Sequence, residues 1–318
     1  MKYNYVIFGS DNDYTRAAFS DIAGKDGIKY LYRKIDTKSK FLTFLYSLHT
    51  SIKTNKLFPL PFKKVWNGKA FKNTFDDGKP ICFLLLAGNR WCNAKYIAYL
   101  RKKYKDAKIV LYFMDLVKMT KPSHGLEVMP LCDLTMTYDK SDAEKYKMKL
   151  YQDVFSNPKI ENAKIEYDVC CIMKAKDRLK KAIDVYDHLE VLGLKSYFYF
   201  TDVSESEQIQ RENVYYGKKL PYGETLEIVA KSKAILEILQ EGSKGYTFRT
   251  CEAVTMGKKL LTDNRSVKEE PFYTPENVCV FDNANEITAD FFVGSADYKG
   301  FENYFSPIKL IDYLDKTL

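Results

Sequence analysis

The sequence lacks the short motifs on which several large enzyme classes depend. No GxGxxG follows its first apolar segment, and neither GxxxxGK with a serine or threonine after it nor GxSxG occurs. These motifs hold a dinucleotide, hold nucleotide phosphates and expose a nucleophilic serine, respectively. Dinucleotide oxidoreductases, P-loop ATPases and serine hydrolases therefore lose their main support.

Long apolar runs are also missing. The longest run, "ICFLLLAG", is much shorter than the about 20 residues that a membrane-spanning helix needs. The first residues, "MKYNYVIFGSDND", lead directly into a predicted strand and do not resemble a signal peptide. No pattern recurs at a fixed period, and 46% of the 318 residues are hydrophobic. We expect a globular protein of two domains with no membrane span.

The seven cysteines form neither a disulfide framework nor a CxxC metal spacing. Their number is odd, and Cys170 and Cys171 are adjacent inside a predicted strand. We expect reduced core thiols in a cytoplasmic protein.

Acidic residues are absent between Thr37 and Thr74, although the net charge of the whole chain is only +8. This segment has eight lysines: Lys38, Lys40, Lys53, Lys56, Lys63, Lys64, Lys69 and Lys72. Aromatic residues are interleaved with them: Phe41, Phe44, Tyr46, Phe58, Phe62, Trp66 and Phe71. Lysines attract an anionic lipid surface by about 1 kcal/mol each, and aromatic side chains suit the lipid–water interface.

Residues 37–74 therefore predict a face that binds the anionic inner surface of the cell membrane. The alternative is a solvated basic loop over a core helix. A nucleic-acid groove is a third interpretation, but no recognition module accompanies the segment, so we expect no nucleic-acid partner.

Short apolar runs alternate with helical patterns in the first half of the chain, as is typical of a parallel sheet with covering helices. The predicted strands are Tyr5–Phe8, Ile81–Leu86, Ile109–Phe113 and Leu134–Thr137. Helical patterns are present in "NAKYIAYLRKKY" and "DKSDAEKYKM". We expect one α/β domain over residues 1–155.

The same alternation restarts after the polar connector "VFSNPKIENAKIE". Strands are predicted in "DVCCIM", "KSYFYFTD", "AILEIL", "KLLTDN" and "NVCVFD", and helices in "DRLKKAIDVYDHLEVLG", which Gly193 would close, and "GETLEIVAKS". We expect a second domain over residues 163–300 and a terminal helix in 301–318 that crosses back to the first domain. The predicted fold is α/β, with two facing Rossmann-like, doubly wound domains.

The stretch "EILQEGSKGYTFRTCEAVTMGKKLLTDN" has the order of residues that an anion site at a helix start needs. Gly242 and Gly245 let the backbone approach a ligand closely, and Thr247 is a suitable N-cap. Arg249 then falls in the first turn, where free N–H groups already favour an anion. Glu252 follows one turn later and can accept hydrogen bonds from two adjacent hydroxyls. The alternative is a surface ion pair between Arg249 and Glu252.

"SKAILEILQEGSKGYTFRTCEAVTMGKKLLTDN" resembles the donor-site signature of GT-B-type glycosyltransferases, in particular bacterial enzymes of lipopolysaccharide, capsule and exopolysaccharide assembly. In that family a loop, an Arg-Thr-x-Glu-Ala helix start and a strand like "GKKLLTDN" recur. "YDVCCIMKAKDRLKKAIDVYDHLEVLG" is similar to the first strand and helix of the same domain. The resemblance covers about residues 165–285. It implies metal-independent hexosyl transfer from a nucleotide sugar, most often a UDP-sugar, to a saccharide or lipid-linked saccharide, with no further cofactor.

The resemblance also implies roles for individual residues. Glu252 would bind the ribose hydroxyls of the nucleotide sugar. The diphosphate would be held by Arg249, Thr250, Thr247, Gly245 and Tyr246, and Lys174 and Arg178 would be further phosphate ligands. Leu220–Tyr222 would lie beside the base. The sequence departs from the family in having "MKAKDR" in place of a glycine-rich turn, and only Glu241 loosely represents a second glutamate before the helix.

A catalytic base should come from the first domain, because an inverting transfer needs deprotonation of the acceptor hydroxyl. The loop "GSDNDYTR" offers Asp11 and Asp13, and "KPSHGLE" offers His124 with Asp115 behind it. The alternatives are turn or cap chemistry for the aspartates and a structural role for the histidine. "DND" also matches a metal-binding Asp-x-Asp pattern of another glycosyltransferase fold, but that fold has no second sheet, so we expect no metal site.

A different class of function is compatible with the same pattern. A non-catalytic two-domain protein that senses or scaffolds through a nucleotide or another anion would bind its ligand without sugar transfer. Nucleotide binding alone would therefore not distinguish the two classes.

Overall fold

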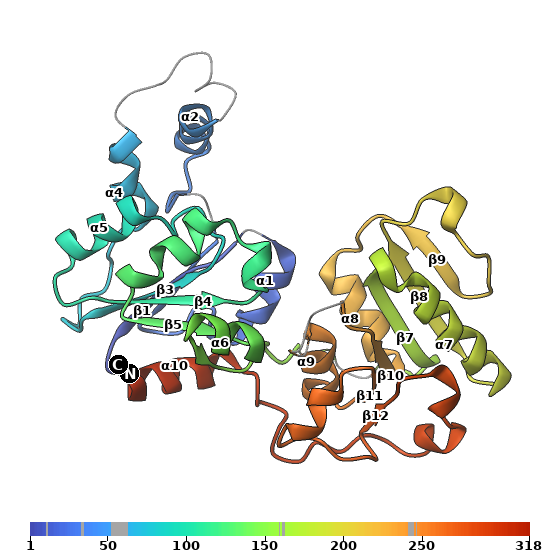
Figure 1. The fold of residues 1–318 in the computed structure, drawn as a ribbon. Coiled ribbons are helices and arrows are strands. Elements are labelled where there is room, and N and C mark those ends of the chain that lie inside the picture. The colour runs from blue at the N-terminus through green and yellow to red at the C-terminus, as the bar shows by residue number, and fades with distance from the viewer. Residues whose placement is uncertain are drawn as a thin grey trace. The chain divides into compact units, whose positions relative to one another are not determined.

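The computed structural model describes residues 1–318 apart from 11, 33–34, 52–62, 159, 161–162, 241–244 and 246, together with the side chain of Lys63. The chain divides into two compact units (Figure 1). The first unit comprises Met1–Tyr138, Asp142–Tyr151 and Leu310–Leu318, and the second comprises Asp139–Ser141 and Gln152–Lys309.

The first unit contains a six-stranded parallel sheet in the order β2-β1-β3-β4-β5-β6. Its strands are β1 (Asn4–Phe8), β2 (Ile28–Leu31), β3 (Ile81–Leu86), β4 (Lys108–Phe113), β5 (Leu134–Thr137) and β6 (Lys149–Leu150). Every residue of β1 and β3 is buried. Continuous apolar runs form these central strands because helices cover both faces of the sheet.

Helices cover both faces of this sheet, and the last helix of the chain is one of them. The helices of this part are α1 (Asp13–Ala18), α2 (Lys40–Thr50), α4 (Asn67–Ala70), α5 (Ala94–Lys103), α6 (Lys140–Tyr146) and α10 (Pro307–Thr317). Ile97 and Leu100 of α5 pack on one face. On the other face, the Tyr5 hydroxyl donates to Asp315 Oδ1 of α10 at 2.6 Å. Both ends of the chain therefore lie close together (Figure 1).

The second unit contains a six-stranded parallel sheet in the order β12-β11-β10-β7-β8-β9. Its strands are β7 (Tyr167–Lys174), β8 (Ser196–Thr201), β9 (Val214–Gly217), β10 (Ser232–Glu237), β11 (Lys259–Thr262) and β12 (Val278–Val280). Counted from β7, this is the 3-2-1-4-5-6 order of dinucleotide-binding folds, in which ligands bind where the order reverses, here between β7 and β10. Helix α7 (Leu179–Val191) covers one face, and α8 (Tyr222–Ala230) and α9 (Phe248–Thr255) cover the other (Figure 1).

The predicted fold class, two Rossmann-like α/β units, is confirmed by these two parallel sheets. Strand β3 has the predicted bounds, and Gly193 follows α7 with a φ of 72° as the expected helix end. The strand predicted in "AILEIL" is displaced, because β10 ends at Glu237. Strands β2, β6 and β9 were not predicted.

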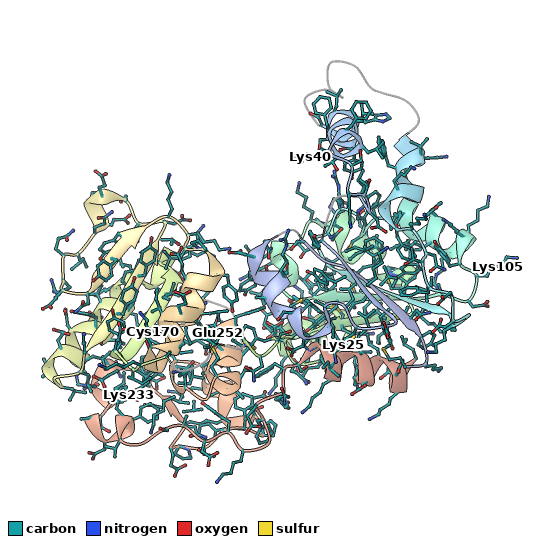
Figure 2. The ribbon with its side chains drawn as sticks, turned by 180° about the vertical axis from the view of Figure 1, so that it is seen from behind. Lys25, Lys40, Lys105, Cys170, Lys233 and Glu252 are labelled. Atoms are coloured by element: carbon teal, nitrogen blue, oxygen red, sulfur yellow. The ribbon has the colours of Figure 1, made fainter. Side chains whose placement is uncertain are left out.

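The prediction for the cysteines as core thiols is confirmed for five of the seven. All seven are free; Cys82, Cys92, Cys170, Cys171 and Cys251 are buried, whereas Cys132 and Cys279 are partly exposed. Burial raises the pKa of the Cys170 thiol, which lies inside the second unit (Figure 2), to about 11. This thiol is therefore protonated and unreactive at neutral pH.

The basic aromatic segment 37–74 needs a correction. Tyr46, Trp66 and Phe71 are buried in the core of the first unit, and the rings of Tyr46 and Trp66 meet edge to face at 5.2 Å. These three aromatic residues cannot contact lipid, because their side chains are buried in the core. Phe41 and Phe44 on α2 are 68% and 62% exposed, whereas Phe58, Phe62, Lys53 and Lys56 lie outside the described residues. Within the described ranges, no helix is both long and apolar enough to span a bilayer.

Candidate functional site

Helix α9 begins as its sequence predicts. The Thr247 side chain accepts a hydrogen bond from the Arg249 backbone N–H at 3.1 Å, so Thr247 is the N-cap. Gly257, with a φ of 62°, follows the last turn, where a residue with a side chain would be strained. The first turn of α9 follows β10 in the chain, and the loop between them leaves the carboxyl end of that strand.

Glu252 of α9 is a completely buried carboxylate with two partners. Its Oε1 accepts a hydrogen bond from the Tyr222 hydroxyl at 2.5 Å, and its Oε2 lies 2.6 Å from Nη1 of Arg249. Burial raises the pKa of Glu252, while the Arg249 charge and the Tyr222 hydrogen bond partly oppose that rise. The pair between Arg249 and Glu252 forms, but the surface alternative is wrong, because the two side chains are only 17% and 0% exposed.

A second buried carboxylate, Glu237 at the end of β10, joins the surrounding elements. Its Oε1 accepts from the Thr247 N–H at 3.0 Å, the Thr247 hydroxyl at 2.6 Å and the Thr250 hydroxyl at 2.9 Å. Its Oε2 accepts from the Thr262 hydroxyl of β11 at 2.6 Å. Glu237 therefore fixes the start of α9 against two strands of the sheet.

Most of the predicted diphosphate ligands near the start of α9 are bonded to other protein groups in the structure. The hydroxyls of Thr247 and Thr250 bond to Glu237, and Thr250 is fully buried. The Gly245 N–H donates to Asp139 Oδ2 at 3.1 Å. Tyr246 lies outside the described residues. Arg249 is the fifth predicted diphosphate ligand of this region. Its guanidinium group carries the charge that could stabilise a diphosphate.

The two other predicted phosphate ligands lie where the strand order reverses. Arg178 follows β7 and donates to the carbonyl oxygens of Ile238 at 2.6 Å and Lys174 at 2.5 Å. It thereby joins the ends of β7 and β10, and burial lowers its pKa. Lys174 is half exposed and forms an ion pair with Asp202. Arg178 thus shapes this edge of the sheet, whereas Lys174 is accessible to a ligand.

The geometry of the second unit combines a Rossmann strand order, a helix start at the carboxyl edge and buried charged residues behind it. Residues 173–311 match the family model described as "Glycosyl transferase-like". The matched segment is less than half of the chain and contains Arg178, Glu237, Arg249 and Glu252. No curated protein matches the sequence.

Several solved structures are similar in fold. An alpha-glucosyltransferase in complex with UDP-glucose and DNA containing an abasic site has 11% identity over 98% of both chains, with a TM-score of 0.49. The apo form of the lipopolysaccharide outer core galactosyltransferase WaaB has 13% identity over 91% of this chain and 87% of its own, with a TM-score of 0.39. The Glycosylation Associate Protein (Gap123) complex from Streptococcus agalactiae has 9% identity over 74% of this chain, with a TM-score of 0.43. This chain spans about half of that protein's length, 52%.

The first unit has a pocket of about 540 Å³ at the carboxyl ends of β1, β3 and β4. It is lined by residues of three loops: Gly9, Ser10, Asn12, Tyr14, Thr15, Leu86, Ala87, Gly88, Asn89, Arg90, Met114, Asp115, Met119, Thr120, Lys121 and His124. This is where the order of the first sheet reverses, between β1 and β3. His124 and Asp115 both line this pocket.

The predicted aspartates of the first unit are less well placed. Asn12 is the N-cap of α1 and accepts from the Thr15 N–H at 2.7 Å. Asp13 is exposed in the first turn, accepts from the Tyr14 N–H at 3.0 Å and does not line the 540 Å³ pocket. Asp11 lies outside the described residues. In the part of the chain that the structure describes, no group of three or more His, Cys, Asp or Glu residues could hold a metal ion.

Sequence reasoning missed the structural roles of Glu237 and Tyr222. Glu237 had a detectable signal, because it is a charged residue inside the apolar run "AILEIL". A glutamate at the end of a buried strand needs hydrogen-bond donors, and the threonines near it in the chain supply them. Tyr222 had no such signal, because it is 30 residues from Glu252.

Proposed function

We propose that this protein transfers a hexose from a nucleotide sugar, in the first place a UDP-sugar, to a saccharide acceptor. The acceptor is a saccharide or a lipid-linked saccharide of surface polysaccharide assembly. The observation that carries the proposal is the buried Glu252–Arg249 pair behind the start of α9, inside the segment that matches a glycosyl transferase-like family model. A helix start with an adjacent arginine favours the diphosphate of such a donor. Glu252 has no exposed surface in this structure, so it supports the proposal by holding Arg249 beside the helix start and not by contacting the ribose.

In the proposed reaction, Arg249 and the N–H groups at the start of α9 stabilise the charge of the leaving diphosphate. These groups supply the positive charge that a metal ion would otherwise supply. Lys174 is a further phosphate ligand, and Gly245, Thr247, Thr250 and Arg178 shape the surroundings of the helix start. Tyr246 stays a predicted diphosphate ligand. The acceptor occupies the 540 Å³ pocket of the first unit, where His124 removes the proton from the attacking hydroxyl and Asp115 orients His124.

A thermal-shift screen against UDP, GDP, CMP and their sugar conjugates tests the donor site. A ligand at about 100 times its dissociation constant stabilises the fold by about 2.7 kcal/mol, so one nucleotide family should raise the melting temperature clearly. Glu252→Gln keeps the volume of the side chain and should reduce this shift, whereas Glu144→Gln changes the same group on exposed α6 and should not. An unchanged shift in Glu252→Gln would contradict the assignment.

The alternative function is a non-catalytic nucleotide sensor or scaffold, and catalysis separates it from sugar transfer. The donor identified by the screen should be hydrolysed slowly, or transferred to a saccharide, by the wild-type protein and not by His124→Ala. Binding without turnover of any donor would favour the sensor.

We also propose that α2 contacts an anionic membrane surface. Phe41 and Phe44 are three residues apart on one exposed face of the helix, beside Lys38 and Lys40. Replacing both phenylalanines with serine should weaken binding to vesicles with anionic lipid about a hundredfold or more, because each buried ring contributes about 1.5–3 kcal/mol. The measurement is vesicle cosedimentation, and Val191→Ser, at an apolar position of the second unit that is 83% exposed, is the control. Undiminished sedimentation of the double variant would remove α2 from the membrane contact.

A further inference from the structure

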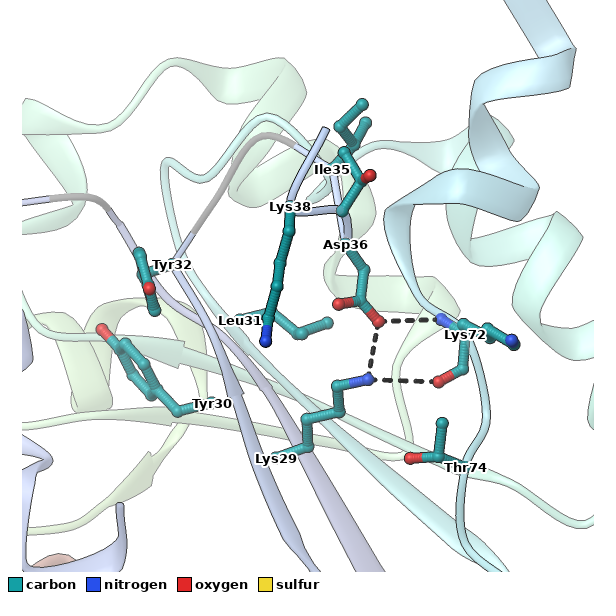
Figure 3. Close-up of a pocket in the computed structure, with 10 residues that line it drawn as sticks. Lys29, Tyr30, Leu31, Tyr32, Ile35, Asp36, Lys38, Lys72 and Thr74 are labelled. Atoms are coloured by element: carbon teal, nitrogen blue, oxygen red, sulfur yellow. Dashed lines mark hydrogen bonds and ion pairs between the residues drawn. The ribbon is translucent and has the colours of Figure 1, made fainter. Parts of the chain in front are cut away.

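A second pocket of the first unit, of about 590 Å³, shares no lining residue with the pocket that contains His124. It lies at β2, the last strand of the sheet on that side. Its lining residues come from β2 and from the segments before α2 and after α4: Lys29, Tyr30, Leu31, Tyr32, Ile35, Asp36, Thr37, Lys38, Lys72 and Thr74 (Figure 3). Since alternate side chains of a strand point to opposite faces, the pocket extends around the edge of β2.

A hydrogen-bonded cluster joins the three segments on one side of this pocket. Lys29 Nζ lies 2.6 Å from Asp36 Oδ2 and 3.3 Å from the Lys72 carbonyl oxygen, and the Lys72 N–H donates to the same carboxylate at 3.2 Å. Asp36 therefore neutralises Lys29 and fixes the wall of the pocket.

The remaining charge of the pocket is positive. Its charged lining residues are three lysines and one aspartate. In Figure 3 the Lys38 side chain crosses Leu31, and its ammonium group ends between the Lys29–Asp36 pair and the side chains of Tyr30 and Tyr32. Lys72 is exposed, and in Figure 3 its ammonium group points away from the Lys29–Asp36 pair. An anion in the pocket would thus lie within reach of the Lys38 ammonium group.

We propose that this pocket binds the phosphate group of an organic phosphate. A phosphate monoester carries almost two negative charges and three acceptor oxygens, which suit the Lys38 ammonium group, the net positive charge of the lining residues and the hydroxyls of Thr37 and Thr74. A carboxylate would use one charge only. The volume suits an organic ligand, and Leu31 with the two tyrosine rings provides an apolar wall for its organic part.

The neighbouring helix indicates where such a phosphate fits in the proposed function. Helix α2 begins two residues after Lys38 and exposes Phe41 and Phe44. A phosphate in the pocket would thus lie next to the surface that we assign to lipid, as the phosphate of a lipid-linked acceptor or of a soluble sugar phosphate. This role in the acceptor rests on the proposed sugar transfer, whereas phosphate binding does not.

Two measurements on the intact chain test the pocket. Calorimetric titration with glucose 1-phosphate tests binding of a soluble phosphate, and cosedimentation with phosphatidic acid vesicles tests binding of a lipid phosphate. Lys38→Gln should weaken binding about tenfold, because it removes a hydrogen bond between two charged groups. Asp36→Asn should strengthen binding, because it removes the negative charge of the pocket. Lys105→Gln and Asp106→Asn make the same charge changes at exposed neighbouring positions outside the pocket and should leave affinity unchanged.

Binding of glucose 1-phosphate alone would identify a soluble phosphate as the ligand, and binding of the vesicles alone would identify a lipid headgroup. Either outcome supports the pocket, provided that Lys38→Gln weakens the binding. Equal weakening by Lys38→Gln and Lys105→Gln, or no binding of either probe, would overturn the proposal. Lys38→Gln should also keep the nucleotide-dependent thermal shift, so that failure of this pocket and failure of the donor site are observed separately.

Discussion

Replacing Glu252 with alanine is expected to lower the free energy of unfolding by about 3–5 kcal/mol, because it removes one partner of a buried ion pair. Arg249 would remain largely buried without the carboxylate that now lies 2.6 Å away, and the Tyr222 hydroxyl would lose its acceptor. Urea denaturation of the wild type and the variant measures this difference. Since Glu252→Ala changes stability as well as the site, the isosteric Glu252→Gln is the better variant for nucleotide binding.

The double variant Glu252→Ala/Arg249→Met is the control for the ion pair. Removing the unpaired guanidinium should restore part of the lost stability, because a matched apolar replacement of both partners is often nearly neutral. If the losses of the two single variants simply add, the pair is not energetically coupled, and the explanation for Glu252→Ala is wrong.

Replacing Glu237 with alanine is expected to lower the free energy of unfolding by about 4 kcal/mol or more. The carboxylate accepts four hydrogen bonds, three of them from threonine hydroxyls, and each buried donor left without an acceptor costs about 1–3 kcal/mol. The start of α9 would also lose its attachment to β10. Nucleotide affinity should therefore fall together with stability, although Glu237 is not proposed to contact the ligand.

Thr262→Val is the matched control for Glu237→Ala. At nearly constant volume it removes one of the four hydrogen bonds to Glu237, together with the bond that the Thr262 hydroxyl accepts from the Asn264 N–H at 3.0 Å, and it leaves the start of α9 attached. It should cost about 2 kcal/mol in urea denaturation and leave the nucleotide-dependent thermal shift unchanged. A loss for Glu237→Ala no larger than that for Thr262→Val would show that the carboxylate does not act as a common acceptor.

The strands that sequence reasoning missed all lie at the edges of the sheets, whereas it predicted the central strands and one edge strand, β12. All six residues of β3 are buried, so its pattern is a continuous apolar run. Strand β2 has one buried residue, β9 has one, and the two residues of β6 are exposed. An edge strand has one neighbour and less apolar area to bury, which weakens the sequence pattern.

The candidate site was predictable where it depends on local chemistry and not where it depends on distant contacts. The N-cap of α9 follows from Thr247 and the next two residues. The burial of Glu252 depends on Tyr222 of another helix, and the bonding of Thr250 depends on a strand that ends earlier than its apolar run suggests. These contacts join residues that are far apart in the chain. They depend on how the helices and strands pack together, which local sequence patterns do not reveal.

Helix α10 also determines the order in which the two units can form during synthesis. Residues 310–318 belong to the first unit, where Leu310, Ile311 and Leu314 are buried and Asp315 accepts from Tyr5. The ribosome makes these residues after the whole of the second unit. The first unit is translated first, but its sheet lacks the covering residues of α10 until the continuous segment 152–309 has been made. That segment can already have folded by then.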